Sequence, residues 1–392
     1  MNLTRRESLR LFGSGLAGAG LAGAGLAGAG LAGSAVEAAA MPVAARPDEV
    51  GAPGKALDRA QLLELLGRVP AEAPPLAPEQ VERVDLGDLV REKVTYAVEI
   101  GERVPAFVFI PKAGIPKPGI PKAGIPKTEI PKAGPPNAGL AHAGAGRYPA
   151  VLCHHQHGGE FQVGKDGPAG LGSNANQHYA IELARRGYVT LVFDALCFNE
   201  RQDATGKLKD DDYERYEGMY RLTEGKTLQG KYVWDSRRAL DYLETRPEVD
   251  RARIGMIGHS LGGQETLFTT AIDTRIRAAA SSCGFASFRA IKREHINHNY
   301  ALFVPGLANY GGFGAVLSLV APRPFLAAAR TTDPIFPKDG IDETVAAGQR
   351  AYAAAGAADR LSTFFEPGEH TFSPAMRQAA YEWLDRWLTA AG

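Results

Sequence analysis

The sequence predicts an α/β fold in which a mostly parallel, mixed sheet is covered by helices on both faces. From residue 148 to the C-terminus, short apolar runs alternate with segments whose apolar residues recur at helical spacing. Parallel strands need helical crossovers of this kind, and strands that are buried on both faces are apolar throughout. Hydrophobic residues make up 45% of the 392 residues, which is enough for one large core.

The region before residue 112 departs from this alternation. Leucines recur at helical spacing in residues 56–67, so we expect a short helix there, within an N-terminal extension at residues 41–80. Residues 82–111 alternate in polarity and are rich in Val, Tyr and Phe, which predicts two or three antiparallel strands. These strands make the sheet mixed, and we expect the main domain to span residues 81–392.

The unit Ile-Pro-Lys recurs every five residues, starting from Ile110. Proline at this spacing removes backbone donors and excludes both a helix and a central strand. We therefore expect a polyproline-like surface loop at residues 111–146. Because an expected strand at residues 148–154 follows directly, this loop is expected to expand a hairpin between two strands. A recognition segment for a partner is the less favoured alternative.

The remaining elements follow in a regular order. Helices are expected at residues 176–187, 227–245, 260–272, 342–356 and 374–391, and strands at residues 188–194, 253–258, 276–282, 324–330 and 361–366. Two segments, residues 196–226 and 284–319, do not fit the alternation. Both follow the carboxyl ends of strands, the edge at which doubly wound sheets bind ligands, so we expect them to cap a cleft.

Charge and cysteine content argue against several classes of function. Lys plus Arg and Asp plus Glu both number 44, so the formal net charge is zero. This balance gives no electrostatic reason to expect binding to nucleic acid or to an anionic membrane surface. The three cysteines have apolar neighbours and are expected to be small buried residues, not a disulfide framework or a metal site. We expect neither a cofactor nor a metal.

The first 40 residues are typical of an export signal. Arg5 and Arg6 precede a mildly apolar run that repeats Gly-Leu-Ala-Gly-Ala, and residues 38–40 form an A-x-A type cleavage site. The segment resembles a twin-arginine signal, which implies export to the periplasm or the medium. No stable membrane span is expected after its removal. A transmembrane anchor is the alternative, although Gly and Ala make the run weakly hydrophobic.

A serine stands between glycines where an apolar strand runs into a helix. In the stretch "IGMIGHSLGGQ", Gly258 and Gly262 would let the backbone bend tightly, so that the Oγ of Ser260 projects above the sheet edge. A serine nucleophile needs a base, and the base needs an orienting acid. His370 lies in the loop after the last expected strand, where such a base is required.

The acid has more than one candidate. Asp333 lies in the turn directly after the expected strand at residues 324–330, so we expect it to orient His370. Asp339, which precedes a glycine, is the alternative acid. Asp342 begins the expected helix at residues 342–356 and is predicted to cap its N-terminus.

Two backbone N–H groups are predicted to stabilise the oxyanion. One belongs to Leu261, at the start of the helix after Ser260, where the helix dipole favours an anion. The other belongs to His157, in the loop "HHQHGG" that follows the strand at residues 148–154. The histidines of this loop, and the pair His295 and His298, also allow a metal site. Neither set has a clear carboxylate or cysteine partner, so we prefer the oxyanion loop.

Two further residues are candidates for substrate binding. Glu200 and Arg201 follow the expected strand at residues 188–194 and should lie near the cleft. They are predicted to bind a polar or acidic substrate, and a purely structural ion pair is the equal alternative.

These motifs together resemble a known superfamily. The segments "HHQHGG", "IGMIGHSLGG", "TTDPIFP" and "PGEH" stand in the order of the α/β-hydrolase superfamily. Within it, "NQHYAIELARRGYVTLVFDALCFNER" is most similar to the dienelactone hydrolase-like and acetyl xylan esterase-like branch. The resemblance covers about residues 105–388 without the repeat loop, and it implies the α/β-hydrolase fold. Two departures are Ser260, where dienelactone hydrolases have a cysteine, and Gln156, where a glycine is usual.

The leading hypothesis is a serine hydrolase that cleaves a small-molecule carboxylic ester through an acyl-enzyme. A serine peptidase of the prolyl oligopeptidase kind shares the fold and the triad and is the first alternative. A catalytically silent hydrolase fold used for binding is the second, although the order Ser260, Asp333, His370 argues against it.

Overall fold

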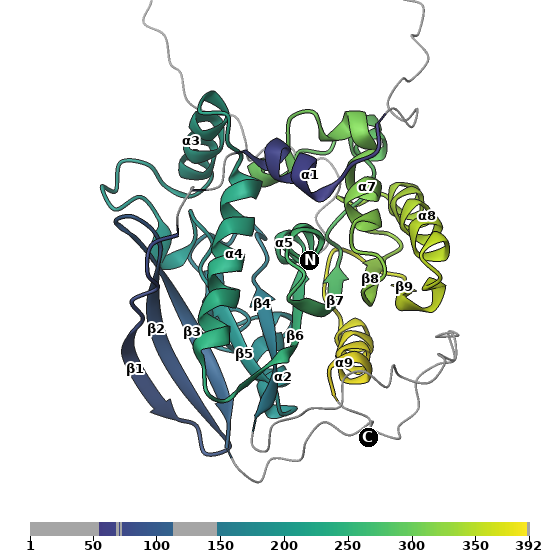
Figure 1. The fold of residues 1–392 in the computed structure, drawn as a ribbon. Helices are drawn as coiled ribbons and strands as arrows, with labels where there is room; N and C mark the ends of the chain where they lie inside the picture. The colour runs from purple at the N-terminus through teal and green to yellow at the C-terminus, as the bar shows by residue number, and fades with distance from the viewer. Residues whose placement is uncertain (1–54, 68–69, 71–72, 113–146, 390–392) are drawn as a thin grey trace, which may run out of the picture. The chain divides into compact units, whose positions relative to one another are not determined.

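The computed structural model describes residues 55–67, 70, 73–112 and 147–389, which belong to one compact unit. Within these residues, nine strands form one mixed sheet in the order β1-β2-β3-β5-β4-β6-β7-β8-β9 (Figure 1). The predicted export signal at residues 1–40 and nearly all of the repeat loop at residues 111–146 lie outside the described part of the chain. Those predictions, like the domain boundaries, therefore stay predictions.

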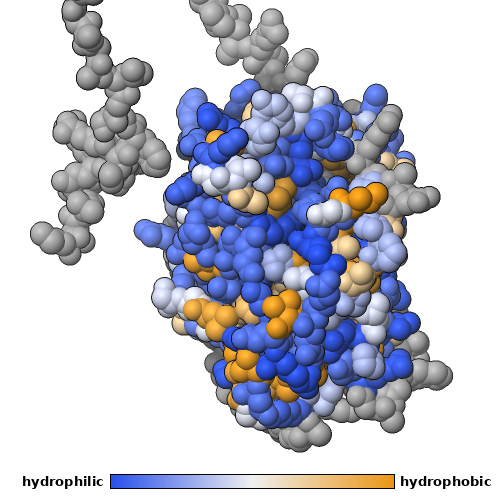
Figure 2. Space-filling model, turned by 90° about the vertical axis from the view of Figure 1, so that its left-hand side faces the viewer, coloured by the Kyte–Doolittle hydropathy of each residue, from blue (hydrophilic) through white to orange (hydrophobic). Residues whose placement is uncertain are grey.

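The first strands form an antiparallel meander. β1 (Glu79–Asp85), β2 (Leu89–Glu99) and β3 (Glu102–Pro111) pair in sequence, and β3 also pairs antiparallel with β5 (Val189–Phe193). β1 is an edge strand, and its residues are mostly exposed and polar. The side of the molecule that carries this edge is largely hydrophilic (Figure 2). Charged side chains on an edge strand hinder pairing with another chain.

The rest of the sheet is parallel. β4 (Tyr148–His154) pairs with β5 and with β6 (Val249–His259), which is followed outward by β7 (Ile276–Ser282), β8 (Phe325–Arg330) and β9 (Leu361–Glu366). The prediction that the repeat loop expands a hairpin is wrong. β5 lies between β3 and β4, so the strands on either side of that loop are not neighbours.

The helices cover both faces of the sheet, as predicted. They are α1 (Arg59–Leu66), α2 (Tyr179–Arg185), α3 (Asp210–Thr223), α4 (Leu228–Thr245), α5 (Leu261–Ile272), α6 (Phe288–Arg293), α7 (Gly312–Ser318), α8 (Lys338–Ala354) and α9 (Pro374–Leu388). α2 and α9 share one face, where Glu182 pairs with Arg377 at 3.1 Å. α4 and α5 cover the other face, where Gln229 donates to Glu265 at 2.6 Å. Both layers pack on the buried strands β4 and β6.

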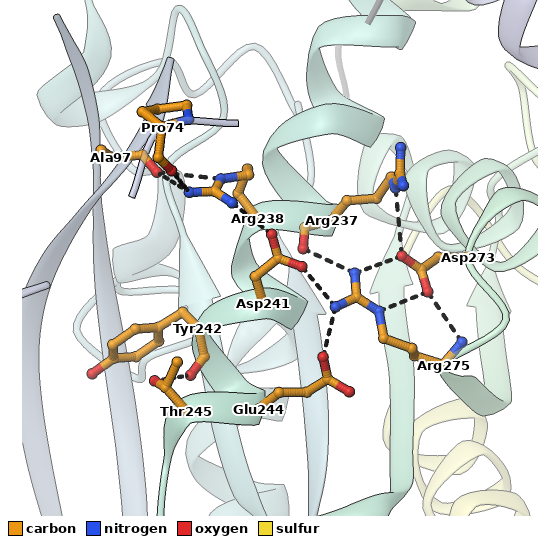
Figure 3. A network of polar contacts seen from close by, with 10 residues as sticks. All are labelled: Pro74, Ala97, Arg237, Arg238, Asp241, Tyr242, Glu244, Thr245, Asp273 and Arg275. Carbon is orange, nitrogen blue, oxygen red and sulfur yellow. Dashed lines mark hydrogen bonds and ion pairs between the residues drawn. The ribbon is translucent and has the colours of Figure 1, made fainter. Parts of the chain in front are cut away.

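A network of ion pairs holds α4 against the connection between α5 and β7 (Figure 3). Arg275 contacts Asp241 at 2.7 Å, Glu244 at 2.8 Å and Asp273 at 2.7 Å. Arg238, which lies one turn before Asp241 on α4, also donates a hydrogen bond to the Asp241 carboxylate at 2.7 Å. Networks of several partly buried charges stabilise more than isolated surface pairs, so this one fixes the helix that packs beside α5.

The two segments that break the alternation carry short helices. Residues 196–226 contain α3, and residues 284–319 contain α6 and α7. The segments touch, since a Cβ at Gly218 of α3 would lie 3.0 Å from the Cβ of Tyr300. Beneath them lies a small apolar cluster of Phe161, Ala195, Leu196, Cys197, Phe198, Leu228, Tyr232, Leu261 and Ala301. Because Leu261 follows Ser260, this cluster connects both segments to the predicted nucleophile.

One predicted helix boundary is wrong. α8 begins at Lys338, four residues before the expected start, directly after Pro337. Asp342 therefore lies inside the helix and does not cap it; its carboxylate pairs with Lys338 at 2.5 Å, one turn earlier. In the described ranges, no helix is both long and apolar enough to cross a membrane.

Candidate active site

Ser260 lies at the sharp turn between β6 and α5. Its backbone has φ 58° and ψ −120°, a conformation that non-glycine residues rarely adopt. A Cβ at Gly258 would lie 2.2 Å from the carbonyl oxygen of Gly262. A Cβ at Gly262 would lie 2.0 Å from the carbonyl oxygen of His154. Both positions therefore require glycine, and the second contact brings the end of β4 against the turn.

The structure brings Ser260, His370 and Asp333 into one hydrogen-bonded line. The Oγ of Ser260 lies 2.8 Å from the Nε2 of His370. The Nδ1 of His370 lies 2.7 Å from the Oδ2 of Asp333. With Nδ1–H donating to the carboxylate, Nε2 is free to accept the serine proton. This is the arrangement that a general base needs.

Asp333 is held firmly in its turn. Its side chain is fully buried, and its Oδ1 accepts hydrogen bonds from the backbone N–H groups of Ile335 at 2.9 Å and Phe336 at 3.2 Å. Burial alone would raise the pKa of this carboxyl group. The bonds from His370 and from the two N–H groups outweigh that effect and hold the pKa below its ordinary value of 3.8.

Asp339, the alternative acid, is engaged elsewhere. Its carboxylate pairs with Arg293 at 2.6 Å and 3.1 Å and is half exposed. The hydrogen bond from Arg293 lowers its pKa. Of the two candidate acids, only Asp333 contacts His370.

The two backbone N–H groups predicted to stabilise an oxyanion are not used elsewhere in the described part of the chain. The N–H groups of Leu261 and His157 have no hydrogen-bond acceptor among the described residues. Leu261 is the first residue of α5, where orphan N–H groups and the helix dipole favour an anion. The end of β4 lies against Gly262, and the loop that carries His157 follows directly from it.

The ring of His157 is bonded to a residue that the sequence did not point to. Its Nδ1 accepts from the N–H of Gly159 at 3.1 Å, so its Nε2 carries the proton. This Nε2–H donates to the Oε2 of Glu214 in α3 at 2.8 Å. Glu214 lies 57 residues further along the chain, and no local pattern marks it.

Two more histidines support the triad. The ring of His259 packs on the ring of His370, with centroids 4.8 Å apart, and burial holds its pKa well below 6.5. The Nε2 of His298 donates to the carbonyl oxygen of Ile335 at 2.9 Å, in the turn that carries Asp333. His259 lies inside the serine motif itself, whereas the sequence marks His298 only as a possible metal ligand.

Glu200 and Arg201 are engaged with other parts of the protein. Glu200 pairs with Lys93 at 2.8 Å and with the buried Lys165. Arg201 is buried; it pairs with Asp235 at 2.8 Å and also with Glu102. For both residues these contacts favour the structural alternative over substrate binding.

Among the histidines that allowed a metal site, His154, His155 and His298 bond to backbone groups. His155 uses both ring nitrogens, toward Gln156 at 2.8 Å and Ala195 at 3.0 Å. In the part of the chain that the structure describes, one group of potential ligands has its atoms within 4.8 Å of one another, namely Cys283, Asp333 and His370. Because two of these three residues already share the hydrogen bond described above, we assign the group to the triad.

Comparison with known proteins identifies relatives. The model of the "Dienelactone hydrolase family" matches residues 168–311. One relative is YtaP of Bacillus subtilis (strain 168), which carries a provisional name as a hydrolase. It is 29% identical over 337 residues, covering 85% of this chain and 100% of YtaP.

Solved structures share the fold. A glucuronoyl esterase from Solibacter usitatus superposes with a TM-score of 0.58 at 18% identity, covering 83% of this chain and 91% of that one. Acetyl xylan esterase 1 from Thermoanaerobacterium sp. JW/SL YS485 superposes with a TM-score of 0.56 at 14% identity, covering 87% of this chain and 96% of that one. The predicted fold is confirmed: the chain has the α/β-hydrolase fold that these structures share. The match of residues 168–311 to the dienelactone hydrolase family model agrees with the predicted resemblance.

Proposed function

We propose that this α/β-hydrolase cleaves carboxylic esters through an acyl-enzyme formed on Ser260. The observation that carries the proposal is the hydrogen-bonded line from Ser260 through His370 to Asp333. The hydroxyl of serine is a poor nucleophile at neutral pH, and an adjacent oriented base is what makes it reactive. The names of the structural relatives, which are esterases, support the same class of reaction.

The reaction proceeds in two halves. In the first, His370 takes the proton of Ser260 while Oγ bonds to the ester carbonyl carbon, and the N–H groups of Leu261 and His157 stabilise the oxyanion. The intermediate collapses, the bond to the alcohol breaks, and His370 returns the proton to the departing alkoxide. In the second half, His370 takes a proton from water, the hydroxide attacks the acyl carbon, and the carboxylic acid leaves as Ser260 regains its proton.

The substrate is proposed to be a small ester of a short acyl group. The relatives are named for esters in which one partner is a sugar, acetyl xylan in one case and a glucuronoyl ester in another. We also propose that the enzyme acts in the periplasm or outside the cell, on the basis of the Arg5-Arg6 signal in the sequence.

Covalent labelling tests the nucleophile. A fluorophosphonate should label the protein, and Ser260→Ala should abolish labelling and lower kcat on an acetate ester by roughly 10⁴-fold or more. Ser173→Ala, at an exposed position, is the control and should be labelled normally. Labelling that survives in the Ser260→Ala variant would reject the proposal.

A leaving-group comparison separates esterase from peptidase. Departure of an amide nitrogen requires protonation, and a peptide must be aligned by binding along an extended site. We therefore expect ready hydrolysis of 4-nitrophenyl acetate and negligible cleavage of prolyl and other peptide anilides. Similar kcat/KM values on the two classes would favour the peptidase.

A further inference from the structure

His157 is tied to a buried carboxylate on a helix of the first inserted segment. We propose that Glu214 of α3 is a positioning residue that fixes His157, and with it the backbone N–H that faces the oxyanion. This inference rests on the proposed function, because it gives Glu214 a part in the same reaction. It assigns to the segment at residues 196–226 a role in the chemical step.

The ring of His157 has one orientation. Gly159 N–H donates to its Nδ1, and its Nε2–H donates to Glu214, so both nitrogens are occupied. The ring also packs edge-on against Phe161 and Phe198, with centroids 4.8 Å and 5.2 Å away. Two hydrogen bonds and two aromatic contacts leave the side chain little freedom to rotate, and a fixed side chain restricts the backbone that carries it.

Three of the four polar groups of His157 are occupied by the protein. Its carbonyl oxygen accepts from the N–H of Glu160 at 3.1 Å, in addition to the two ring bonds. Its own N–H has no acceptor within the described ranges. Backbone N–H groups that are shielded from water are nearly always bonded. A free N–H on an otherwise fully bonded residue is therefore suited to an anion that arrives with the substrate.

Stability alone does not explain a carboxylate at position 214. Its side chain is fully buried, it has a single partner, His157, and its Oε1 has no partner in the described part of the chain. Burying a charge with one hydrogen bond costs free energy, and an apolar side chain of similar size would avoid that cost. What the carboxylate provides is a strong, directional acceptor that selects one tautomer of His157.

The test is a pair of substitutions measured on the full-length protein. Glu214→Leu removes the acceptor at similar volume and should lower kcat on 4-nitrophenyl acetate by about 10- to 100-fold, less than the 10²- to 10³-fold loss of a whole oxyanion donor. Glu214→Gln keeps a carbonyl acceptor and should recover most of the activity. KM should change little in either variant, because the donor acts on the transition state.

A boronic acid inhibitor supplies a second readout. It forms a tetrahedral adduct with a reactive serine, so its affinity should fall in parallel with kcat/KM in Glu214→Leu. The double variant Glu214→Leu with His157→Phe, which keeps the backbone N–H, should lose little more than either single variant. Glu217→Gln, at an ion pair with Arg221 on the same helix, is the matched control and should retain normal activity.

The outcomes are decisive in both directions. If Glu214→Leu lowers the melting temperature but the folded protein keeps its kcat and boronate affinity, the residue is merely structural and the inference is wrong. If the wild-type protein shows Ser260 labelling and ester turnover while Glu214→Leu behaves like wild type, the inference fails and the proposed function stands. If the wild-type protein cleaves no ester, the NMR signal of the His157 Nε2 proton still reports the hydrogen bond to Glu214. An unchanged signal in Glu214→Leu would show that Glu214 does not fix the ring, and the inference would be wrong.

Discussion

The two sides of Ser260 differ in how far their hydrogen bonds are completed within the protein. On the acid–base side, Asp333 accepts three hydrogen bonds, and His370 is bonded at both ring nitrogens. On the side where we propose that the oxyanion binds, the N–H groups of Leu261 and His157 have no acceptor among the residues the structure describes. The hydrogen bonds of Ser260, His370 and Asp333 are therefore in place without a substrate, whereas in our proposal the reacting carbonyl group supplies the missing acceptor for the two N–H groups. Both arrangements reduce the reorganisation needed during the reaction.

Each side is supported by a different inserted segment. The turn that carries Asp333 is bonded to His298, from residues 284–319, through the carbonyl oxygen of Ile335. The loop that carries His157 is bonded to Glu214, from residues 196–226. Substitutions in the two segments should therefore impair different parts of the same reaction.

The largest expected effect lies on the acid–base side. Asp333→Asn should keep the fold but leave His370 in the wrong tautomer, with a loss in kcat on the order of 10⁴-fold, by analogy with other triads. Asp339→Asn is the control and should be close to wild type, since Asp339 pairs with Arg293. Steady-state kinetics on an acetate ester, with circular dichroism to check folding, measures both. Near-normal activity of Asp333→Asn would move the acid to Asp339.

A smaller effect is expected where the second segment supports the acid turn. His298→Ala removes one hydrogen bond to Ile335, while Asp333 keeps its own backbone bonds. A single hydrogen bond contributes about 1 kcal/mol, which corresponds to about a five-fold change in kcat. His298→Gln can still donate and should recover part of the loss. His295→Asn, three residues away and exposed, should have no effect; a similar loss there would mean that the whole segment, not the bond, matters.

The smallest expected effect is a change of stability with pH. The hydrogen bonds that Asp333 accepts hold its pKa below 3.8, so its carboxylate stays ionised above about pH 4. A folded-state pKa below the unfolded value adds stability above the unfolded pKa, and this is lost as pH falls through the folded pKa. The stability difference between wild type and Asp333→Asn, measured by urea unfolding, should therefore shrink between pH 7 and pH 3. A difference in stability that stays constant over this pH range would contradict the lowered pKa of Asp333.

The sequence is most informative about features that depend on the local order of residues. Ser260 comes directly after a strand, and Asp333 and His370 lie in the loops that follow two other strands. Parallel strands end at one edge of the sheet, so the meeting of the three residues could be expected. The partners of Arg201 could not be predicted from the sequence, because Asp235 and Glu102 come from other elements and no sequence spacing links them to Arg201. The same holds for Glu214 and His157. The false hairpin around the repeat loop has a related cause, since hydrophobic periodicity locates strands without giving their order in the sheet.

The backbone conformation of Ser260 is strained, and the strain is tolerated because the position needs the hydroxyl of serine. A non-glycine residue at φ 58° and ψ −120° is strained by about 1 to 3 kcal/mol. Glycine would adopt this conformation without strain, so a chain with Ser260→Gly would be inactive and yet the more thermostable of the two. Selection for stability and selection for turnover therefore act in opposite directions at this single position, and drift toward glycine is opposed only while the enzyme is in use.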